Sequence, residues 1–238
     1  MKGKKREMSM DITILYEDPY IIVVEKSAGV PAQKDTTGDQ SVLEVVKNHI
    51  KEQYPQSRNP YVGLVHRLDR PVGGIMVLAK TKEANQSLSA QMQNRTVEKR
   101  YWTVVCGKGR EGVQKLQHYL KRYPKQNISK VVTFDVPRAK EAILTYKKIA
   151  EIKDQTEILS LLEIELKTGR HHQIRVQLST VGLPIWGDTK YNPRFIKPKE
   201  WVSIALWAGF ISFEHPKTKK TCTFHTKLPD IYPFNLFL

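Results

Sequence analysis

One stretch constrains the fold of this chain more than any other, because it joins a charged turn directly to a continuous apolar run. Residues 75–79 are apolar without interruption, which predicts a buried strand. In the turn before that strand, Asp69 lies between Arg67 and Arg70. The sequence therefore predicts a carboxylate held among cations on a support that is anchored in the core.

The charge of the whole chain indicates its partner. The 238 residues carry a formal net charge of +15, and such an excess of cations attracts polyanions because binding releases their counterions. Nucleic acid is therefore the favoured partner. A charged surface that serves solubility alone is the alternative, and an excess this large in one domain makes it the weaker one. We find no basic amphipathic helix of the kind that binds anionic membranes.

The cellular setting follows from what the sequence lacks. No apolar run reaches the roughly 18 residues that span a membrane, and no signal-peptide core follows the basic residues 1–10. We expect a cytoplasmic protein with a flexible arm over residues 1–10 and a single domain over residues 11–238. Cys106 and Cys222 lack metal-site or disulfide spacing and are expected to be buried, reduced thiols.

Two helices are marked by their N-terminal caps. Ser41 and Glu44 form a capping box, and apolar residues at four-residue spacing continue from there to about residue 54. Thr81 caps a second helix, which closes at residues 94–95.

The other elements are mostly strands. A third helix is expected to start near Arg170 and to leave Arg175 away from its apolar stripe. Because no regular βαβ alternation connects the elements, the pattern favours the α+β class. Strands are expected over residues 12–15, 20–25, 75–79, 99–106, 131–134, 142–149, 157–167, 203–213 and 221–224.

Residues 116–130 look irregular and cationic. Several lysines and Arg122 surround Tyr119 and Tyr123, and aromatic rings among cations suit base stacking and phosphate contact. A solvated hairpin without such a role is an equal alternative.

The remaining polar motifs exclude several kinds of chemistry. His171 and His172 are adjacent and do not face one site, and Arg170 and Arg175 beside them would repel a metal ion. No metal site is expected, and the sequence has no zinc-protease, phosphate-loop, dinucleotide-binding or nucleophile-elbow motif.

Asp69 is the candidate that remains. Nearby arginines favour its ionised form, which makes it a poor general acid but a competent nucleophile or electrostatic stabiliser. The alternative is a turn aspartate that merely pairs with Arg67 or Arg70, since such surface pairs are common and weak.

A set of motifs in order along the chain resembles the RluA family of pseudouridine synthases. The set covers about residues 12–230, and its order makes it specific where any one motif would be weak. The matching segments are Glu17-Asp18, Val23-Val24-Glu25-Lys26-Ser27-Ala28-Gly29, His66-Arg67-Leu68-Asp69 with Gly74, Lys99-Arg100-Tyr101, Thr168-Gly169-Arg170-His171-His172-Gln173-Ile174-Arg175-Val176, Gly187-Asp188-Thr189-Lys190-Tyr191 and His215-Pro216.

The chain departs from the family pattern at two places. Pro71-Val72-Gly73-Gly74 stands where the family usually has Asp-Thr-Ser-Gly, and His171 stands where the family has a threonine. Neither change removes a candidate catalytic group, although both could alter loop shape or substrate choice.

The resemblance implies a reaction and a fold. The reaction is isomerisation of uridine to pseudouridine inside an RNA chain, either ribosomal or transfer RNA, which requires the base to leave its stack. It needs no cofactor. The implied fold is a mixed, mainly antiparallel sheet flanked by helices with a central RNA-binding cleft, which agrees with the α+β class. We expect a monomer without an obligate protein partner.

The resemblance also implies roles for the catalytic residues. Asp69 is the nucleophile or the group that supports glycosidic cleavage, and these two roles stay open. Arg175 is its expected ion-pair partner, with Arg170 as the second choice. Tyr101 stacks on the flipped uracil and could assist proton transfer.

Further residues are expected to contact the substrate. Arg67 fills the gap that the flipped base leaves, because a planar cation can stack there. Ile174 or Val176 walls the base pocket, and His66 and Gln173 complete the substrate contacts.

Two other functions compete with this one. A catalytically silent RNA-binding protein could share the fold, but the joint presence of Asp69, Tyr101 and Arg175 argues against it. A nucleoside hydrolase would release free uracil and would usually need a second acid to activate water, and no clear second acid accompanies Asp69.

Overall fold

The computed structural model describes residues 12–56, 59–154, 157–196 and 202–238. In this part of the chain, eleven strands form one sheet in the order β1-β2-β4-β10-β5-β9-β8-β6-β7, with β3 paired to β4 and β11 paired to β10. The strands are β1 (Thr13–Glu17), β2 (Ile21–Lys26), β3 (Gly63–Leu64), β4 (Gly73–Ala79), β5 (Glu98–Cys106), β6 (Val113–Tyr123), β7 (Ile128–Val132), β8 (Lys140–Asp154), β9 (Glu157–Leu166), β10 (Leu206–Glu214) and β11 (Thr221–His225). The helices are α1 (Val42–Gln53), α2 (Lys82–Asn94) and α3 (Gln173–Thr180).

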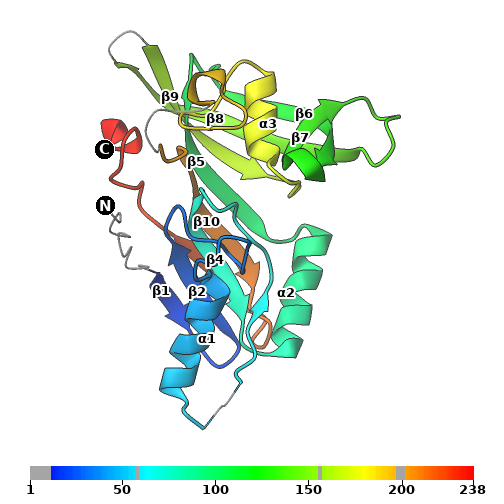
Figure 1. Ribbon diagram of the computed structural model, residues 1–238, viewed down its shortest axis with the longest axis vertical. Coiled ribbons are helices and arrows are strands. Elements are labelled where there is room, and N and C mark those ends of the chain that lie inside the picture. Colours follow the sequence, from blue (N-terminus) through cyan, green and yellow to red (C-terminus); the bar gives the residue numbers. More distant parts are fainter. Residues whose placement is uncertain (1–11, 57–58, 155–156, 197–201) are drawn as a thin grey trace, which may run out of the picture.

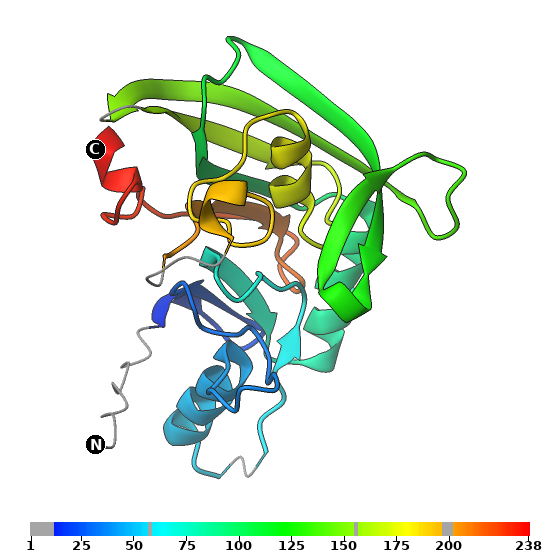
Figure 2. The same ribbon diagram turned by 45° about the horizontal axis from the view of Figure 1, so that its top comes forward.

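The sheet is mixed and mainly antiparallel, as predicted, since the β4–β10 pair is parallel and the other strand pairs described are antiparallel. Strand β5 connects two parts of the molecule (Figure 1). One part contains β1, β2, β4 and β10 with α1 and α2, and the other contains β6 to β9 with α3, which lies in front of its strands in Figure 2. The α+β prediction is confirmed.

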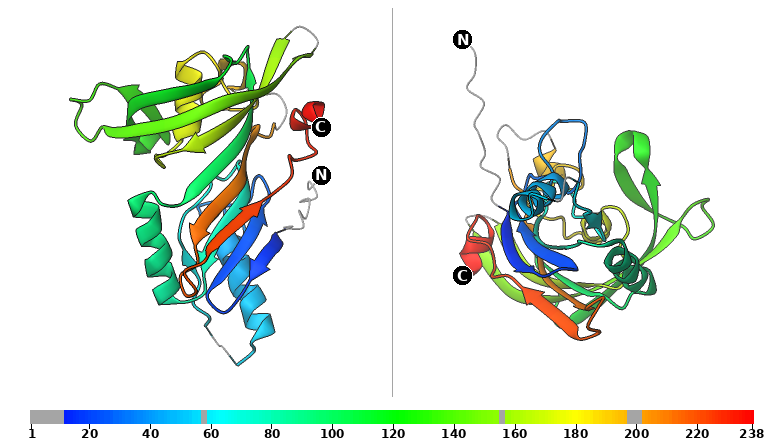
Figure 3. Two further views of the ribbon diagram at one scale, coloured as in Figure 1. Left: turned by 180° about the vertical axis from the view of Figure 1, so that it is seen from behind. Right: turned by 90° about the horizontal axis from the view of Figure 1, so that it is seen from below.

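Strand β4 is the predicted apolar run, and every one of its residues is buried. Its alternate side chains enter two different clusters. Met76 and Leu78 pack in the cluster that includes α1, whereas Ile75 and Val77 pack in the cluster that includes Leu88 of α2. The two helices flank this strand (Figures 1 and 3). The loop before β4, which carries Asp69, is therefore attached to a strand that the core holds on both faces.

The predicted helix starts are confirmed for α1 and α2. Ser41 and Glu44 form the capping box of α1, and Thr81 accepts a hydrogen bond from the backbone of Ala84 at the start of α2. Arg95 closes α2 in the left-handed conformation, with φ of 60°.

The third helix differs from its prediction. α3 begins at Gln173 rather than near Arg170, because His172 is its N-cap and has a left-handed φ of 54°. Arg175 was expected to lie away from the buried stripe, yet it is only 3% exposed. Residues 173–178 are all buried, so this helix carries polar residues into the core rather than presenting one apolar face.

The prediction that residues 116–130 are irregular is wrong. They form the antiparallel β6–β7 hairpin, which β8 extends. Alternation in β6 was hidden because His118 takes an inward position between Leu116 and Leu120, where it lies 3.0 Å from Nε2 of Gln177.

The departure at Pro71-Val72-Gly73-Gly74 has a structural reason. A β-carbon on Gly73 would lie 2.1 Å from Cζ3 of Trp207, the residue opposite it in β10. Gly74 has a φ of 117°, and a β-carbon there would lie 2.3 Å from the carbonyl oxygen of Ala208. The two glycines let β4 approach β10 closely.

Three other expectations concern the rest of the chain. Cys106 and Cys222 are free but only partly buried, so the prediction of buried thiols is wrong in degree. In the described ranges no helix has the length and apolarity of a membrane span. The arm predicted over residues 1–10 lies outside the described residues.

Candidate active site

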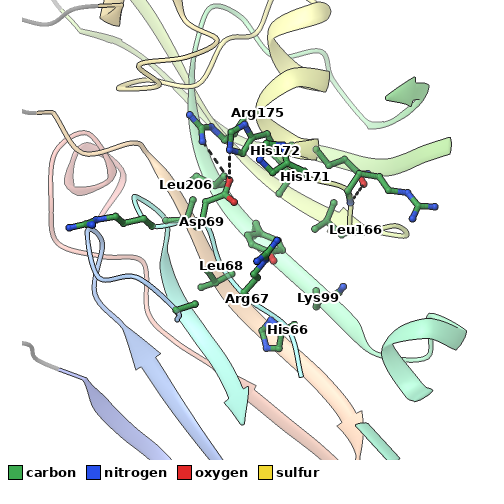
Figure 4. Close-up of a pocket in the computed structure, with 18 of the residues that line it drawn as sticks. His66, Arg67, Leu68, Asp69, Lys99, Leu166, His171, His172, Arg175 and Leu206 are labelled. Carbon is green, nitrogen blue, oxygen red and sulfur yellow. Dashed lines mark hydrogen bonds and ion pairs between the residues drawn. The ribbon is translucent and has the colours of Figure 1, made fainter. Parts of the chain in front are cut away.

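A cavity of about 1130 Å³ collects most of the predicted site residues (Figure 4). They come from the loop before β4, from β5, and from α3 with the turn that leads into it. Those that line the cavity are His66, Arg67, Asp69, Tyr101, Arg170, Gln173, Ile174 and Arg175.

Asp69 meets the arginine that was predicted as its first partner. Nη1 of Arg175 lies 3.5 Å from Oδ2 of Asp69. Arg170, the second choice, instead donates from Nε to the carbonyl of Glu141 at 2.9 Å. Nε2 of His172 also approaches Oδ2 of Asp69, at 3.6 Å. Both contacts therefore converge on one oxygen, and neither uses Oδ1.

Asp188 holds Arg175 in place, and sequence reasoning gave it no role. Nε and Nη2 of Arg175 donate to the two oxygens of Asp188 at 2.8 and 2.7 Å. Oδ1 of Asp188 also accepts the backbone N–H groups of Lys190 and Tyr191. Burial works to lower the pKa of Arg175, but its bonds with Asp188, together with the charge of Asp69, raise that pKa above its ordinary value. A buried arginine requires a buried carboxylate, but the sequence pattern did not indicate this pair, because it predicted Arg175 away from the buried stripe.

Tyr101 lies in the cavity as a buried side chain. Burial raises the pKa of its phenol, and the nearby charge of Asp69 raises it further. Tyr101 is therefore protonated at neutral pH, so it can accept a proton only by giving up its own at the same time.

His66 anchors the loop before β4 to the sheet. Its Nε2 accepts the backbone N–H of Val77 at 3.1 Å. Burial lowers the pKa of His66 to about 3, with a further contribution from Lys99, so the ring is neutral. Although it lines the cavity, one ring nitrogen is already engaged with β4.

Gln173 also lines the cavity while its side chain is engaged in hydrogen bonds within the protein. Its Oε1 accepts from the hydroxyl of Thr168 at 2.8 Å and from the backbone N–H of Arg170 at 3.0 Å. Its amide nitrogen donates to the carbonyl of Ile143. These contacts hold the turn that carries Arg170 into the cavity.

Lys26 is a second residue whose role the sequence did not reveal. It is fully buried, and its Nζ donates to the carbonyls of Val30 at 2.7 Å, Ser27 at 3.1 Å and Arg70 at 3.1 Å. Burial lowers its pKa to about 7, and the charge of Asp69 partly offsets that effect. Three carbonyls match the three N–H groups of an ammonium ion, so Lys26 ties the loop before β4 to the loop after β2.

Two cations beside Asp69 differ in their freedom. Arg70, one of the two alternative partners of Asp69, instead pairs with Asp35 and Asp39 and donates from Nε to the carbonyl of Gly29. Arg67 is exposed, and within the described ranges it makes no hydrogen bond or ion pair. It is the cation of this motif that remains available to a ligand.

Val176 does not meet its prediction. It packs against Leu120 and Ala142, on the side of α3 that faces β6 and β8, whereas Ile174 lines the cavity. Ile174 and Val176 are two positions apart on this helix and so point in different directions. Of these two alternatives for the pocket wall, only Ile174 lines the cavity. Among the residues that the structure describes, no cluster of three His, Cys, Asp or Glu side chains could hold a metal ion.

Comparisons with known proteins agree with this geometry. The RNA pseudouridylate synthase family matches residues 20–180. The uncharacterized RNA pseudouridine synthase YlyB of Bacillus subtilis is 34% identical over 224 residues, 93% of this chain and 70% of that protein. Ribosomal large subunit pseudouridine synthase D of Pseudomonas aeruginosa is 31% identical, over 100% of this chain and 74% of its own length.

Solved structures give a similar result for the fold. Human RNA pseudouridylate synthase domain containing 4 superposes with a TM-score of 0.77 over 94% of this chain and 92% of that one, at 22% identity. At that level of identity the likeness concerns the fold alone.

Proposed function

The chain belongs to the RNA pseudouridylate synthase family and isomerises uridine to pseudouridine in RNA, and from that premise we propose that Asp69 starts the reaction through its Oδ1 oxygen. The observation that carries this proposal is the convergence of Arg175 and His172 on the other oxygen, Oδ2. A carboxylate that is fixed through one oxygen keeps its charge and its orientation while the second oxygen faces the substrate.

The reaction exchanges one bond for another. The bond from N1 of uracil to C1′ of the ribose breaks, the base turns, and C5 bonds to C1′, while the proton from C5 is lost and N1 gains one. Attack of Oδ1 at C1′ or at the base would both be compatible with this geometry. The guanidinium of Arg175, 3.5 Å from Oδ2 of Asp69, holds the carboxylate in place for either attack.

The walls of the cavity suit a flipped base. We assign Tyr101 to stack on the uracil, with Ile174 and Leu206 as further apolar contacts. Arg67 is exposed at the cavity and is the residue proposed to fill the gap in the RNA. Arg170 lines the same cavity and completes the substrate contacts, with His66 and Gln173 as lining residues that also hold the loop before β4 and the turn before α3.

The substrate is proposed to be ribosomal RNA. The argument rests on several relatives that are named as ribosomal large subunit synthases, and on the net charge of +15, which suits a structured polyanion. We further propose a single domain over residues 11–238 that acts in the cytoplasm as a monomer, without a cofactor or an obligate protein partner.

The test is the substitution Asp69→Ala. We expect loss of pseudouridine formation with RNA affinity within about threefold of the original, because Asp69 acts in the chemical step while other residues hold the RNA. Pseudouridine in ribosomal and transfer RNA would be mapped by chemical derivatisation in cells with and without the protein, and free uracil would be measured in parallel.

The outcomes separate the competing functions. Full activity of the Asp69→Ala variant would refute the assignment of Asp69. Release of free uracil by the unaltered protein would favour a hydrolase, and a change confined to transfer RNA would move the substrate to that class.

A further inference from the structure

The two adjacent histidines before α3 form a stacked pair that the proposed reaction leaves unexplained. The rings of His171 and His172 are 3.7 Å apart at an angle of 25°. Of the two histidines, His172 contacts Asp69, at 3.6 Å, and Figure 4 shows the pair beside that carboxylate. The left-handed backbone at His172 gives this turn its shape.

A chain of hydrogen bonds fixes which nitrogen of His172 carries its proton. The backbone N–H of Ser129 in β7 can only donate, and it reaches the phenol oxygen of Tyr191 at 2.7 Å. The same phenol lies 2.8 Å from Nδ1 of His172. Tyr191 has one proton, and among the described residues Nδ1 of His172 is the acceptor within reach of it. His172 then carries its proton on Nε2, which faces Oδ2 of Asp69 at 3.6 Å.

The charge state of the ring agrees with this assignment. Burial lowers the pKa of His172 to about 2, and the charge of Arg175 adds to the effect. The ring therefore has a single proton to place. A separation of 3.6 Å is long for a hydrogen bond, and catalytic contacts of this kind commonly shorten when the substrate closes the site.

His171 ties the same pair to the β6–β7 hairpin. Its Nδ1 lies 2.9 Å from the hydroxyl of Ser129, and its Nε2 lies 3.1 Å from Oδ1 of Asn127. Lys190 adds a third tie, from Nζ to the carbonyl of Asn127 at 2.6 Å. The hairpin and the catalytic carboxylate are thus linked through two stacked imidazoles and one phenol.

We propose that His172 is a positioning residue for Asp69, a neutral imidazole whose Nε2–H holds Oδ2 while Oδ1 reacts, and whose proton is placed by Tyr191 and the backbone of Ser129. This inference rests on the proposed function of Asp69. It gives the carboxylate of Asp69 a second hydrogen-bond donor, which carries no charge. The position of this donor depends on the β6–β7 hairpin as well as on α3.

A matched pair of substitutions tests the proposal. In His172→Gln the amide nitrogen extends about as far as Nε2 and can donate to Asp69. In His172→Asn the shorter amide ends near Nδ1, where its oxygen can accept the hydrogen bond from Tyr191 but no donor reaches Asp69. We expect His172→Asn to lower kcat about 10- to 100-fold, the usual loss for a hydrogen bond to a charged group, with KM for RNA within about threefold. His172→Gln should retain kcat within about fivefold.

The proton itself can be observed. Nitrogen-15 spectra of histidine-labelled protein should show His172 protonated on Nε2, and Tyr191→Phe should give a mixture of tautomers and a smaller loss of kcat. Equal kcat in the Asn and Gln variants, a loss confined to KM, or a proton on Nδ1 in the unaltered protein would each overturn the proposal.

The control is Asp69→Ala, measured in parallel. If that variant is inactive while His172→Asn keeps full kcat, only the role of His172 fails. If Asp69→Ala is active, the proposed function fails first. The melting temperatures of the two His172 variants should agree. If they differ, activity is measured at a temperature well below both melting temperatures, where both variants are folded.

Discussion

Asp69 is supported from two sides that differ in kind. The loop that carries it continues into β4, whose side chains are apolar and buried on both faces. On the other side Asp69 meets Arg175 of α3, which Asp188 of the following loop holds, and these two residues are polar and buried. Apolar packing is non-directional and tolerates small shifts, whereas a buried ion pair fails as a unit when one member is lost. The two supports should therefore respond differently to substitution.

The polar support should give the largest effect. Asp188→Ala leaves the guanidinium of Arg175 buried without its bidentate partner, and removing one member of a buried pair costs about 3–5 kcal/mol. We expect the free energy of unfolding, measured by urea titration, to fall by that amount and kcat to fall with it, because Arg175 would lose its orientation toward Asp69.

The exposed ion pair between Arg70 and Asp39 is the control for that experiment. Asp39→Ala removes a partner of Arg70, but both side chains are substantially exposed, and surface pairs contribute little. Its unfolding curve should lie close to that of the unaltered protein. Equal losses in the two variants would contradict the distinction between buried and exposed pairs.

The apolar support is tested at its closest approach. Gly73→Ala places a β-carbon 2.1 Å from the ring of Trp207, and overpacking of this kind costs about 1–3 kcal/mol. Gly169→Ala is the control, because its new β-carbon would meet only Nζ of Lys99 at 3.8 Å. A double-mutant cycle with Trp207→Leu should recover part of the loss. If the two substitutions show no coupling, the new β-carbon is accommodated by a shift of strand β4 and not by the ring of Trp207.

The two supports also differ in how far the sequence predicted them. The buried strand at residues 75–79, the capping box at Ser41 and the α+β class could all be predicted, since they follow from local pattern. The partnership of Arg175 with Asp188 could not, because two residues thirteen positions apart meet only after α3 ends and the chain turns back through left-handed backbone at Gly182 and Gly187.

Other errors have the same origin. Arg70 and Asp69 are neighbours in sequence, yet Arg70 turns toward Asp35 and Asp39, which lie on a different loop. Val176 follows Arg175 directly, but one helical step moves it to another cluster. Sequence pattern predicts elements and which faces are apolar, whereas the choice of partner among several charged groups depends on tertiary geometry.

Each support contains one histidine that should make the protein sensitive to acid. Burial lowers the pKa of His172 to about 2 and that of His66 to about 3, whereas an unfolded histidine takes a proton near pH 6.5. The unfolded chain therefore binds more protons below about pH 6.5, so the free energy of unfolding rises with pH across that range and falls on acidification.

The size of this effect can be measured for each side separately. One such histidine contributes about 1.4 kcal/mol for each pH unit below about pH 6. His172→Gln and His66→Gln should each reduce the slope of the free energy of unfolding between pH 6 and pH 5 by that amount. The same change at the exposed His225 is the control, and a slope unaffected by His66→Gln would show that its ring is protonated in the folded protein.

The smallest effect concerns the hairpin, whose two faces offer cations in different directions. Arg122 lines the cavity, whereas Nζ of Lys121 and of Lys130 lie 5.7 and 5.4 Å from the ring centre of Tyr123, on the opposite face of the hairpin. If RNA enters through the cavity, Arg122→Gln should weaken binding and reduce the slope of log affinity against log salt by about 1. Lys121→Gln should leave that slope unchanged, since its ammonium lies against an aromatic ring on the far side. Binding would be measured by filter binding from low to high salt. Equal losses in the two variants would mean that RNA contacts both faces of the hairpin, including the face with Tyr123.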